Sequence, residues 1–246
     1  MMDTWLVFGA TSGIAVPVVR QLAKRGHSLL LAARDEEHLK RLAGDLRARY
    51  QVEVTTLNFD ANDLDGAEEW VRSVDREHGP IEGVFWATGY LGDQAEEQER
   101  FAAAKKSITI NFLAAVAYLH PVASLMQKRK RGHIVAIGSV AGDRGRMKNY
   151  IYGSAKSALN RFLQGMMQRL YRSGVAVTIV KPGFVNTKMT QSLDDMFLVA
   201  EPSRVAADIV RGIEKRSEEV YTPWFWWGIM HIIRHIPVRL FKRLSL

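Results

Sequence analysis

The stretch TWLVFGATSGIA, residues 4–15, decides the fold of this chain. Its apolar start, Thr4–Phe8, predicts a strand, and the pattern over residues 12–24 predicts a helix directly after it. Glycines at such a turn let the backbone approach a pyrophosphate, and the helix N-terminus offers unpaired N–H groups. The turn therefore predicts a dinucleotide site, although a glycine turn alone can also be an ordinary turn. The residues expected to form this part of the site are Gly9, Thr11, Ser12, Gly13 and Ile14.

Short apolar runs alternate with longer amphipathic stretches through the rest of the chain. The pattern predicts strands at residues 4–8, 28–33, 53–58, 83–87, 133–138, 176–181 and 219–222. It predicts helices at residues 12–24, 35–49, 63–78, 96–130, 152–173 and 202–217. Apolar strands that alternate with helices indicate a parallel sheet covered on both faces. We therefore expect an α/β fold, a single doubly wound Rossmann domain over residues 1–222 with a central, mostly seven-stranded parallel sheet. An aromatic and basic helical segment, the C-terminal tail, follows over residues 223–246.

Composition narrows the classes of function. Charged residues make up 24% and hydrophobic residues 47% of the chain, as in a soluble globular domain. The absence of cysteine excludes disulfides, thiolate catalysis and cysteine-ligated metals. No metal site is expected, because His231 and His235 lie four residues apart without a third ligand. The net charge of +8 favours anionic partners, but the cations are scattered and no nucleic-acid-binding motif occurs, so nucleic acid is not expected as a partner. The first residues lack the basic region and cleavage site of a signal peptide, which favours a cytoplasmic location.

Arg34 follows the second predicted strand, where a carboxylate would bind the ribose 2′-hydroxyl of NAD. An arginine there can pair with a 2′-phosphate instead, which predicts NADP(H) as the cofactor, with NAD(H) as the alternative. Arg34 could also simply open the helix that follows. Asp60, with Ala61 beside it, could accept a hydrogen bond from the adenine amino group, although Asp is also a common turn residue. The backbone at Ala87 and Gly89 is expected to approach the adenosine half of the cofactor.

Tyr152 and Lys156 stand four residues apart in a predicted helix and therefore share a face. A neighbouring ammonium favours phenolate, so the pKa of the tyrosine would fall below its usual value of about 10. Ser139, thirteen residues before the tyrosine, could hold a carbonyl oxygen against the phenol. Tyr and Lys at this spacing are usually an ordinary surface pair. Together with the serine and the glycine turn, however, they predict a site that moves a proton on or off a carbonyl or alcohol.

These motifs, in this order, resemble the short-chain dehydrogenase/reductase family in its compact form with NADP(H), over about residues 3–222. The glycine turn and the segment at residues 87–89 are similar to family motifs, with departures at Phe8, Ala15 and Trp86. The resemblance implies a catalytic tetrad of Asn111, Ser139, Tyr152 and Lys156. It also implies contacts to the nicotinamide half of the cofactor from Tyr152, Lys156, Pro182, Gly183, Val185 and Thr187.

The family's mechanism, carried over to these positions, gives each residue an expected role. Tyr152 would protonate the substrate oxygen as hydride reaches the carbonyl carbon, and Ser139 would orient the carbonyl. Lys156 would lower the pKa of the tyrosine and bind the nicotinamide ribose. Asn111 would hold a water that links Lys156 to solvent.

The chain is also similar to one branch of the family, which includes the reductase subunit of decaprenylphosphoryl-β-D-ribose 2-epimerase. The similar segments are AGDRGR at residues 141–146, KPGFV at residues 181–185 and the ending that starts with IRHIP. This similarity implies a bacterial cell-envelope context, a polyprenyl-phosphate-linked keto-sugar as substrate and a separate flavin oxidase that makes the ketone. Three cations of the loop before Tyr152 could bind a phosphate of such a substrate. They are Arg144, Arg146 and Lys148, and the alternative is a solvated loop paired to Asp143.

The C-terminal tail contains cations and tryptophans, and no acidic residue follows Glu219. Its apolar run before Arg234 is shorter than the roughly 20 residues that a transmembrane helix needs. Aromatic residues with Arg239, Lys242 and Arg243 predict a helix that lies in the membrane interface, on the cytoplasmic face. The alternative is an arm packed on a partner subunit or over the active site, because small domains of the resembled family often form homo-oligomers.

Two rival functions stay open at this point. The first is a reductase of an apolar ketone, such as a 3-oxoacyl chain or a steroid. The second is a non-catalytic NADP(H)-binding regulatory protein, which would require a broken catalytic tetrad. All four residues of the tetrad are present.

Overall fold

The computed structural model describes residues 3–191 and 196–244, and these form a seven-stranded sheet with helices on both faces. The order in the sheet is β3-β2-β1-β4-β5-β6-β7, and every neighbouring pair is parallel. The predicted doubly wound α/β fold is therefore confirmed. The strands are β1 (Thr4–Phe8), β2 (Ser28–Ala33), β3 (Val54–Asn58), β4 (Ile81–Trp86), β5 (Gly132–Ile137), β6 (Val175–Pro182) and β7 (Glu219–Thr222). The main helices are α1 (Ala15–Lys24), α2 (Glu36–Tyr50), α3 (Ala67–Glu77), α4 (Gln94–Glu99), α5 (Phe101–Ile108), α6 (Ala114–Arg129), α7 (Tyr150–Leu170) and α8 (Pro202–Glu214).

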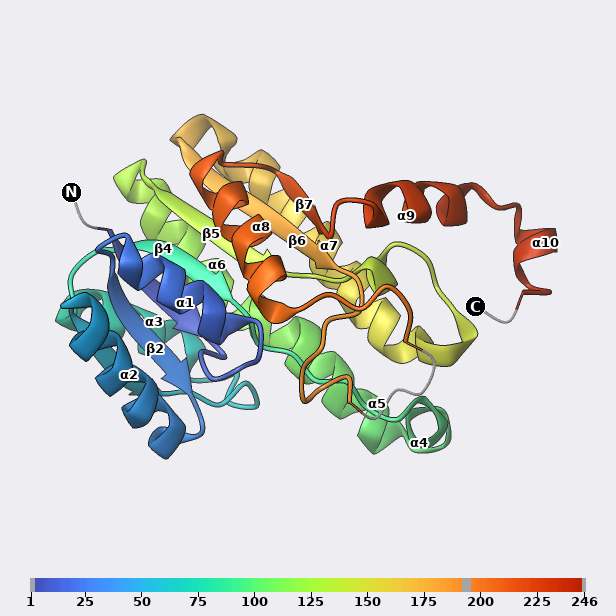
Figure 1. Cartoon of the computed structure of the whole chain (residues 1–246), viewed down its shortest axis with the longest axis horizontal. Coiled ribbons are helices and arrows are strands. Elements are labelled where there is room, and N and C mark those ends of the chain that lie inside the picture. The colour runs from blue at the N-terminus through green and yellow to red at the C-terminus, as the bar shows by residue number, and fades with distance from the viewer. Residues whose placement is uncertain (1–2, 192–195, 245–246) are drawn as a thin grey trace.

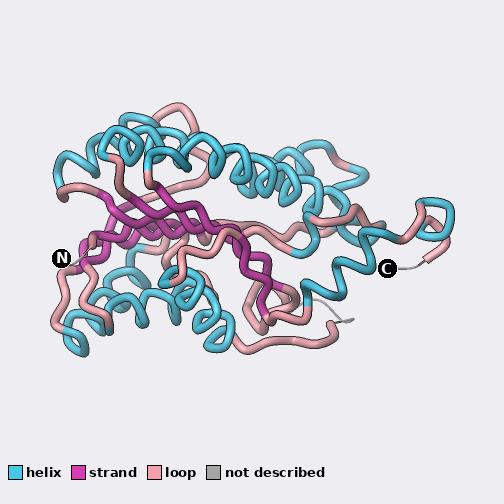
Figure 2. Tube along the Cα trace, turned by 90° about the horizontal axis from the view of Figure 1, so that it is seen from above, coloured by secondary structure: helices cyan, strands magenta, loops and turns pink. Residues whose placement is uncertain are grey.

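The sheet lies between two layers of helices (Figure 2). Strand β1 serves both layers, because successive side chains of a strand point to opposite faces. Leu6 and Phe8 belong to the apolar cluster that includes residues of α3, α6 and α7. Trp5 and Val7 belong to the opposite cluster, with residues of α1, α2 and α8. Burial on both faces explains why the strand reads as a continuous apolar run.

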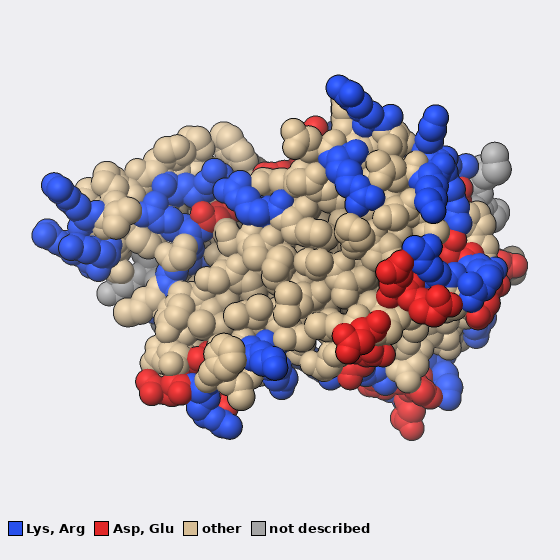
Figure 3. Space-filling view, turned by 180° about the vertical axis from the view of Figure 1, so that it is seen from behind, with Lys and Arg blue, Asp and Glu red and all other residues tan. Residues whose placement is uncertain are grey.

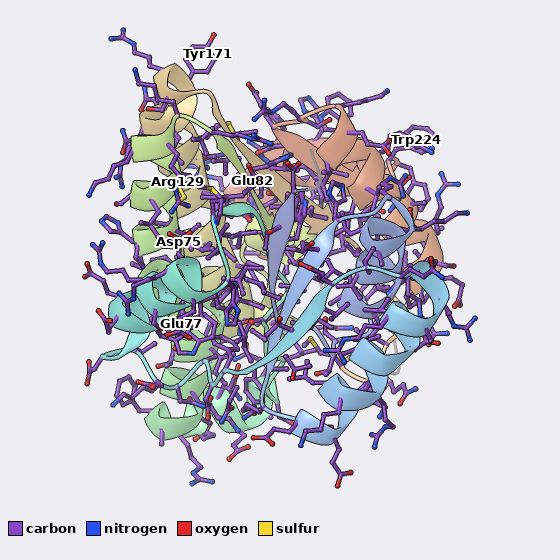
Figure 4. All side chains as sticks on the ribbon, turned by 90° about the vertical axis from the view of Figure 1, so that its left-hand side faces the viewer. Asp75, Glu77, Glu82, Arg129, Tyr171 and Trp224 are labelled. Carbon is purple, nitrogen blue, oxygen red and sulfur yellow. The ribbon has the colours of Figure 1, made fainter. Side chains whose placement is uncertain are left out.

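Side-chain contacts join the helices on one face of the sheet to each other and to a strand. On one face, the Asp75 carboxylate of α3 accepts from the Arg129 guanidinium of α6 at 2.7 Å, and both residues are labelled in Figure 4. The same carboxylate accepts from the backbone N–H of Ile81 at 3.0 Å. This one side chain therefore joins α3, α6 and the start of β4.

The predicted helix over residues 96–130 is interrupted twice. Arg100 has an extended backbone, with φ −126° and ψ 107°, and separates α4 from α5. A π-helical turn, η1 (Thr109–Leu113), then joins α5 to α6. The stretch Phe101–Arg129 contains an 18-residue window with a mean hydropathy of 1.5, apolar enough to pass for a membrane span. Half of that window is buried, as in the core helix of a folded domain.

The C-terminal tail projects away from the sheet (Figure 1). It contains α9 (Trp226–His235) and α10 (Val238–Phe241). Trp226 and Met230 are buried against Val140, whereas the rest of α9 is partly or fully exposed. Trp224, at the base of the tail, points outward and is 75% exposed (Figure 4). The tail thus has its buried side chains at its base, and most of its side chains beyond that are partly or fully exposed.

Candidate active site

A cavity of about 500 Å³ opens at the carboxyl ends of β1, β2 and β4. Crevices at this edge of a doubly wound sheet are where such folds bind ligands. The predicted cofactor residues that line it are Gly9, Thr11, Ser12, Arg34, Asp60, Ala61, Ala87 and Gly89. The structure therefore brings this part of the predicted site together. Sequence reasoning missed Asn62, Lys106 and Met189, which line the same cavity from other segments.

Only glycine fits at position 9 of the glycine turn. Gly9 has φ +68°, and a Cβ there would lie 2.9 Å from the carbonyl oxygen of Ala87. The turn is held by the Ser12 N–H, which donates to the Gly9 carbonyl at 2.9 Å. The Ser12 hydroxyl accepts from the N–H of Ala15, where α1 begins. The predicted start at residue 12 was three residues early, because residues 11–14 form the turn.

Arg34 lies at the edge of this cavity and is exposed. Within residues 3–191 and 196–244, its guanidinium has no ion-pair partner. Asp35, and not Arg34, caps the start of α2, because its carboxylate accepts from the His38 N–H at 2.9 Å. Asp60 is held in place by the backbone and side-chain N–H groups of Asn62. An unpaired cation at the end of β2 fits a 2′-phosphate.

A second cavity, of about 680 Å³, adjoins the first and contains the predicted reacting groups. Predicted residues that line it are Thr11, Ser12, Gly13, Ile14, Ala87, Gly89, Ser139, Tyr152, Lys156, Pro182, Gly183, Val185 and Thr187. A Cβ on Gly13 would lie 2.8 Å from Cγ2 of Thr187, so the glycine turn and the segment after β6 meet here. The two cavities together match the adenosine and nicotinamide halves of a dinucleotide in their lining residues.

Tyr152 and Lys156 come from the first turns of α7, and Ser139 follows β5. The Lys156 ammonium lies 5.8 Å from the centre of the Tyr152 ring and donates to the Ile137 carbonyl at 3.0 Å. The Ser139 hydroxyl accepts from the Ala141 N–H at 3.0 Å and hydrogen-bonds the Tyr152 phenol. A phenol, a hydroxyl and an ammonium thus converge on one cavity.

Burial dominates the acidities of this site. It raises the pKa of Tyr152 to about 12, against the opposing effect of the Ser139 hydrogen bond. It also lowers the pKa of Lys156 to about 8. The sequence-based expectation was a tyrosine pKa lowered by Lys156. The structure differs because desolvation penalises the charged forms of both groups, and the ammonium faces the Ile137 carbonyl.

Asn111 lies in the π-helical turn rather than in a regular helix, and it is fully buried. Its amide donates to the Tyr90 carbonyl at 2.6 Å and to the Ser107 carbonyl at 2.9 Å, and its oxygen accepts from the Tyr90 N–H at 3.1 Å. A Cβ on Gly89 would lie 3.3 Å from the Asn111 oxygen and 3.5 Å from the Lys156 ammonium. Asn111 and Lys156 therefore border the same small space, although Asn111 does not line the larger cavity.

The three loop cations have different places. Arg144 donates to the carbonyl oxygens of Arg234 at 2.8 Å and Ile236 at 3.0 Å, and it stacks on the Phe241 ring at 4.3 Å. It therefore holds the C-terminal tail, and the structure does not support the predicted contact of Arg144 with substrate. Among the described residues, the buried Nε of Arg146 has no hydrogen-bond partner, and burial lowers the pKa of its guanidinium. Lys148 is exposed on the turn that follows.

A buried ion pair that the sequence did not predict fixes the loop after Ser139 to β6. The Lys181 ammonium lies 3.2 Å from the Asp143 carboxylate and 3.1 Å from that of Glu219. The Tyr221 hydroxyl donates to Asp143 at 2.7 Å. Asp143 thus pairs with Lys181 of β6, and its negative charge also acts on the guanidinium of Arg146. The cluster joins the loop after Ser139 to the strands that lead into the tail.

The base of the tail also contacts the wall of the second cavity. A Cβ on Gly183 would lie 1.9 Å from the indole nitrogen of Trp226, so only glycine fits beside this ring. Phe184 and Phe197 pack on the same indole, with ring centres 6.0 and 5.5 Å away. The base of the tail therefore packs directly on the segment after β6 that lines the candidate active site.

Comparisons with known proteins agree with this architecture. The family model for short chain dehydrogenases matches residues 3–197. An uncharacterised oxidoreductase of Mycobacterium tuberculosis is 36% identical over 239 residues, which cover 97% of this chain and 96% of that protein. A short-chain dehydrogenase from Sphingobium yanoikuyae in complex with NADPH has a TM-score of 0.84 and 27% identity, covering 96% of this chain and 97% of that one. A variant of the actinorhodin polyketide ketoreductase with NADPH has a TM-score of 0.76 and 25% identity, covering 85% and 89%. This chain belongs to the short-chain dehydrogenase family of oxidoreductases.

Proposed function

We propose that the protein reduces a ketone to a secondary alcohol with NADPH. The observation that carries the proposal is the convergence of Ser139, Tyr152 and Lys156 on one cavity beside the glycine turn. The similar NADPH complexes, one of them a ketoreductase, support both the cofactor and the reaction class.

The residues present fit NADP(H). Gly9, Gly13 and the N-terminus of α1 leave room and N–H donors for the pyrophosphate, and the exposed Arg34 at the cavity edge suits the 2′-phosphate. Pro182, Val185 and Thr187 would hold the nicotinamide half in the second cavity. The bound nicotinamide would supply the hydride.

The chain's own residues would supply the proton and the alignment. With a pKa of about 12, the Tyr152 phenol stays protonated at neutral pH and can donate to the substrate oxygen as negative charge develops there. The Ser139 hydroxyl would hold that oxygen beside the phenol. Lys156, whose pKa is about 8, is mainly an ammonium at pH 7 and would stabilise the phenolate left behind. Asn111, in the space shared with Lys156, would hold the water through which the proton returns.

For the substrate, we propose a keto-sugar carried on a polyprenyl phosphate, made by a separate flavin oxidase at the cytoplasmic face of a membrane. Arg146 supports an anionic or hydroxylated substrate, because its buried Nε has no partner in the described part of the chain. The projecting basic and aromatic tail supports a substrate that resides in a membrane. We also propose that the protein forms a homo-oligomer, as small domains of this family often do.

A second candidate is a reductase of an apolar ketone. The observation that favours it is the apolar lining of the second cavity, which includes Ile14, Val16, Pro17 and Met189. A probe of each class separates the two candidates: methyl 2-keto-β-D-erythro-pentofuranoside for the keto-sugar and trans-1-decalone for the apolar ketone.

Substitution of the proposed proton donor tests the reaction itself. Tyr152→Phe removes only the phenolic hydroxyl, so kcat with either ketone should fall by about 10²–10⁴-fold, the usual contribution of a positioned acid. NADPH binding, measured by the fluorescence of the nicotinamide, should persist. Tyr150→Phe is the matched control, because Tyr150 is two residues away on α7 and partly exposed. Turnover retained in Tyr152→Phe would remove the tyrosine from this role. NADPH binding without turnover in the wild type would support the non-catalytic rival.

A further inference from the structure

The segment after β6 contains a tight turn, residues 187–190, whose shape is set by Thr190. The Thr190 N–H donates to the Thr187 carbonyl at 3.0 Å. The Thr190 hydroxyl accepts from the Thr187 N–H at 3.2 Å and hydrogen-bonds the Val185 carbonyl. These bonds close the turn on itself and leave Lys188, in its middle, with an exposed side chain.

This turn crosses the cleft formed by the two cavities. At its start, Cγ2 of Thr187 would lie 2.8 Å from a Cβ on Gly13, just before α1. Further along, Cε of Met189 would lie 3.9 Å from a Cβ on Gly89, after β4. Met189 lines both cavities, so the turn lies over their junction. Lys188, between these two contacts, therefore lies where the adenosine and nicotinamide halves of a dinucleotide would be joined.

The charge at this junction suits a pyrophosphate, the group that joins the two halves. Lys188 lines the second cavity together with Gly13 and Ile14, which lead into α1. The other lysine of that lining, Lys156, is buried and donates to the Ile137 carbonyl. Lys188 is exposed, and no carboxylate among the described residues pairs with it. A lysine ammonium on its flexible stem binds phosphate as a point charge.

We propose that Lys188 binds the pyrophosphate of NADP(H), so that this group is held between the lysine and the N-terminus of α1. The inference rests on the proposed cofactor site and adds a residue to it. The pyrophosphate is common to NADPH and NADH, whereas the 2′-phosphate opposite Arg34 is not. Lys188 therefore contributes to the affinity for both cofactors and not to the choice between them.

Two fragments of the cofactor separate these contacts. The first, 2′-phospho-ADP-ribose, has the pyrophosphate and the 2′-phosphate, whereas adenosine 2′-monophosphate has the 2′-phosphate alone. Binding of both fragments, NADPH and NADH is measured by calorimetry for the wild type, Lys188→Met and Lys188→Arg. Lys215→Met is the matched control, because Lys215 is an exposed lysine at the end of α8 that lines neither cavity.

Lys188→Met should weaken binding of 2′-phospho-ADP-ribose, NADPH and NADH by the same factor, about three- to tenfold. This range lies between the effect of an exposed ion pair and that of a hydrogen bond to a buried charge. Binding of adenosine 2′-monophosphate should not change. Lys188→Arg, which keeps the charge, and Lys215→Met should bind all four ligands nearly as the wild type does. The loss should shrink at high ionic strength, because salt screens an exposed charge.

An equal loss for both fragments would show that Lys188 does not act on the pyrophosphate and would overturn the inference. Unchanged binding of 2′-phospho-ADP-ribose in Lys188→Met would also overturn it, and a wild type that still reduces either ketone would leave the proposed function in place. The expected loss in a protein that oxidises NADPH with neither ketone would retain the role of Lys188 and refute the reduction. If Lys188→Met lowers kcat/KM for the keto-pentoside but binds every cofactor normally, the lysine contacts substrate and the inference is wrong.

Discussion

Arg34 is the residue on which the choice between the two nicotinamide cofactors depends. Its guanidinium, which has no ion-pair partner in the part of the chain that the structure describes, borders the cavity for the adenosine half. Hydrogen bonds to charged groups contribute about 1.5–3 kcal/mol, which corresponds to roughly 10–100-fold in affinity. Arg34→Asp should therefore raise KM for NADPH by roughly 10–100-fold, because the carboxylate repels the 2′-phosphate. It should also lower KM for NADH, because the carboxylate can accept from the 2′-hydroxyl.

Initial rates with both cofactors at a fixed ketone concentration measure this change. Arg41→Asp makes the same change in charge on α2, and Arg41 does not line the cavity. The ratio of KM for NADPH to KM for NADH in Arg41→Asp should match that of the wild type. An unchanged ratio in Arg34→Asp would remove Arg34 from the 2′-phosphate.

At the scale of residues, spacing predicted some of the site and not the rest. Gly9 and Tyr152 could be placed because local geometry, a left-handed turn and a helix face, gives each its position. Arg144 could not, because its partners Arg234 and Ile236 belong to a distant segment whose position depends on the whole fold. The lowered pKa of Lys156 could not be predicted from the sequence either, because it results from burial in the folded site.

At the scale of elements, the seven strands were predicted nearly to the residue. The five inner strands are short apolar runs that the sheet buries on both faces, whereas the edge strands β3 and β7 are only partly buried. The helices were less predictable. Residues 96–130 have a continuous helical pattern, yet Arg100 breaks the helix and Asn111 lies in a π-helical turn. Amphipathic periodicity locates a helix but does not reveal one extra residue in a turn. The interruptions place α4 against the first turn of α7, where Gln94 accepts from the Ile151 N–H, and place Asn111 beside the space that Lys156 borders.

The ion pair between Lys181 of β6 and Asp143 should stabilise these elements. Both side chains are at most 6% exposed, so Lys181→Met leaves a buried carboxylate without its main cation. Breaking a buried pair from one side costs about 3–5 kcal/mol. For a chain of this size, Tm should fall by roughly 10 °C, measured by calorimetry. Lys40→Met removes a 71% exposed lysine from a surface pair with Glu36 and should change Tm by about 1 °C. Equal changes in the two variants would show that the buried pair does not stabilise the fold.

At the scale of the whole molecule, the C-terminal tail connects the wall of the candidate active site to an exposed segment of aromatic, apolar and basic residues. Trp226 packs on Gly183 at the cavity wall, and beyond it the chain projects with exposed Trp227, Val238 and Leu240. Seen from behind, the end of the molecule that carries the tail shows Lys and Arg side chains with few Asp or Glu, whereas cations and carboxylates mix at the opposite end (Figure 3). A symmetric dimer through the tail would bring like charges together. This distribution supports the proposal that the tail contacts an anionic lipid surface.

The cations of the tail allow this partner to be tested without removing Trp226. Each Lys or Arg near an anionic membrane contributes about 1 kcal/mol, so Arg239→Gln, Lys242→Gln and Arg243→Gln together should weaken partition by roughly a hundredfold. Sedimentation with vesicles of phosphatidylcholine and phosphatidylglycerol measures the change, and vesicles of phosphatidylcholine alone should bind little of any protein. Trp227→Ser should weaken binding to the anionic vesicles as well, because the exposed indole would enter the interface.

The matched control removes the same charge from exposed lysines outside the tail, with Lys24→Gln, Lys40→Gln and Lys128→Gln combined. It should bind anionic vesicles nearly as the wild type does, because these lysines are not brought to the membrane by the tail. If the control and the tail variant lose binding equally, net charge rather than the tail is responsible. If the wild type binds no vesicles and the tail variant changes the molar mass in light scattering, the tail contacts a second copy of the chain instead of a membrane.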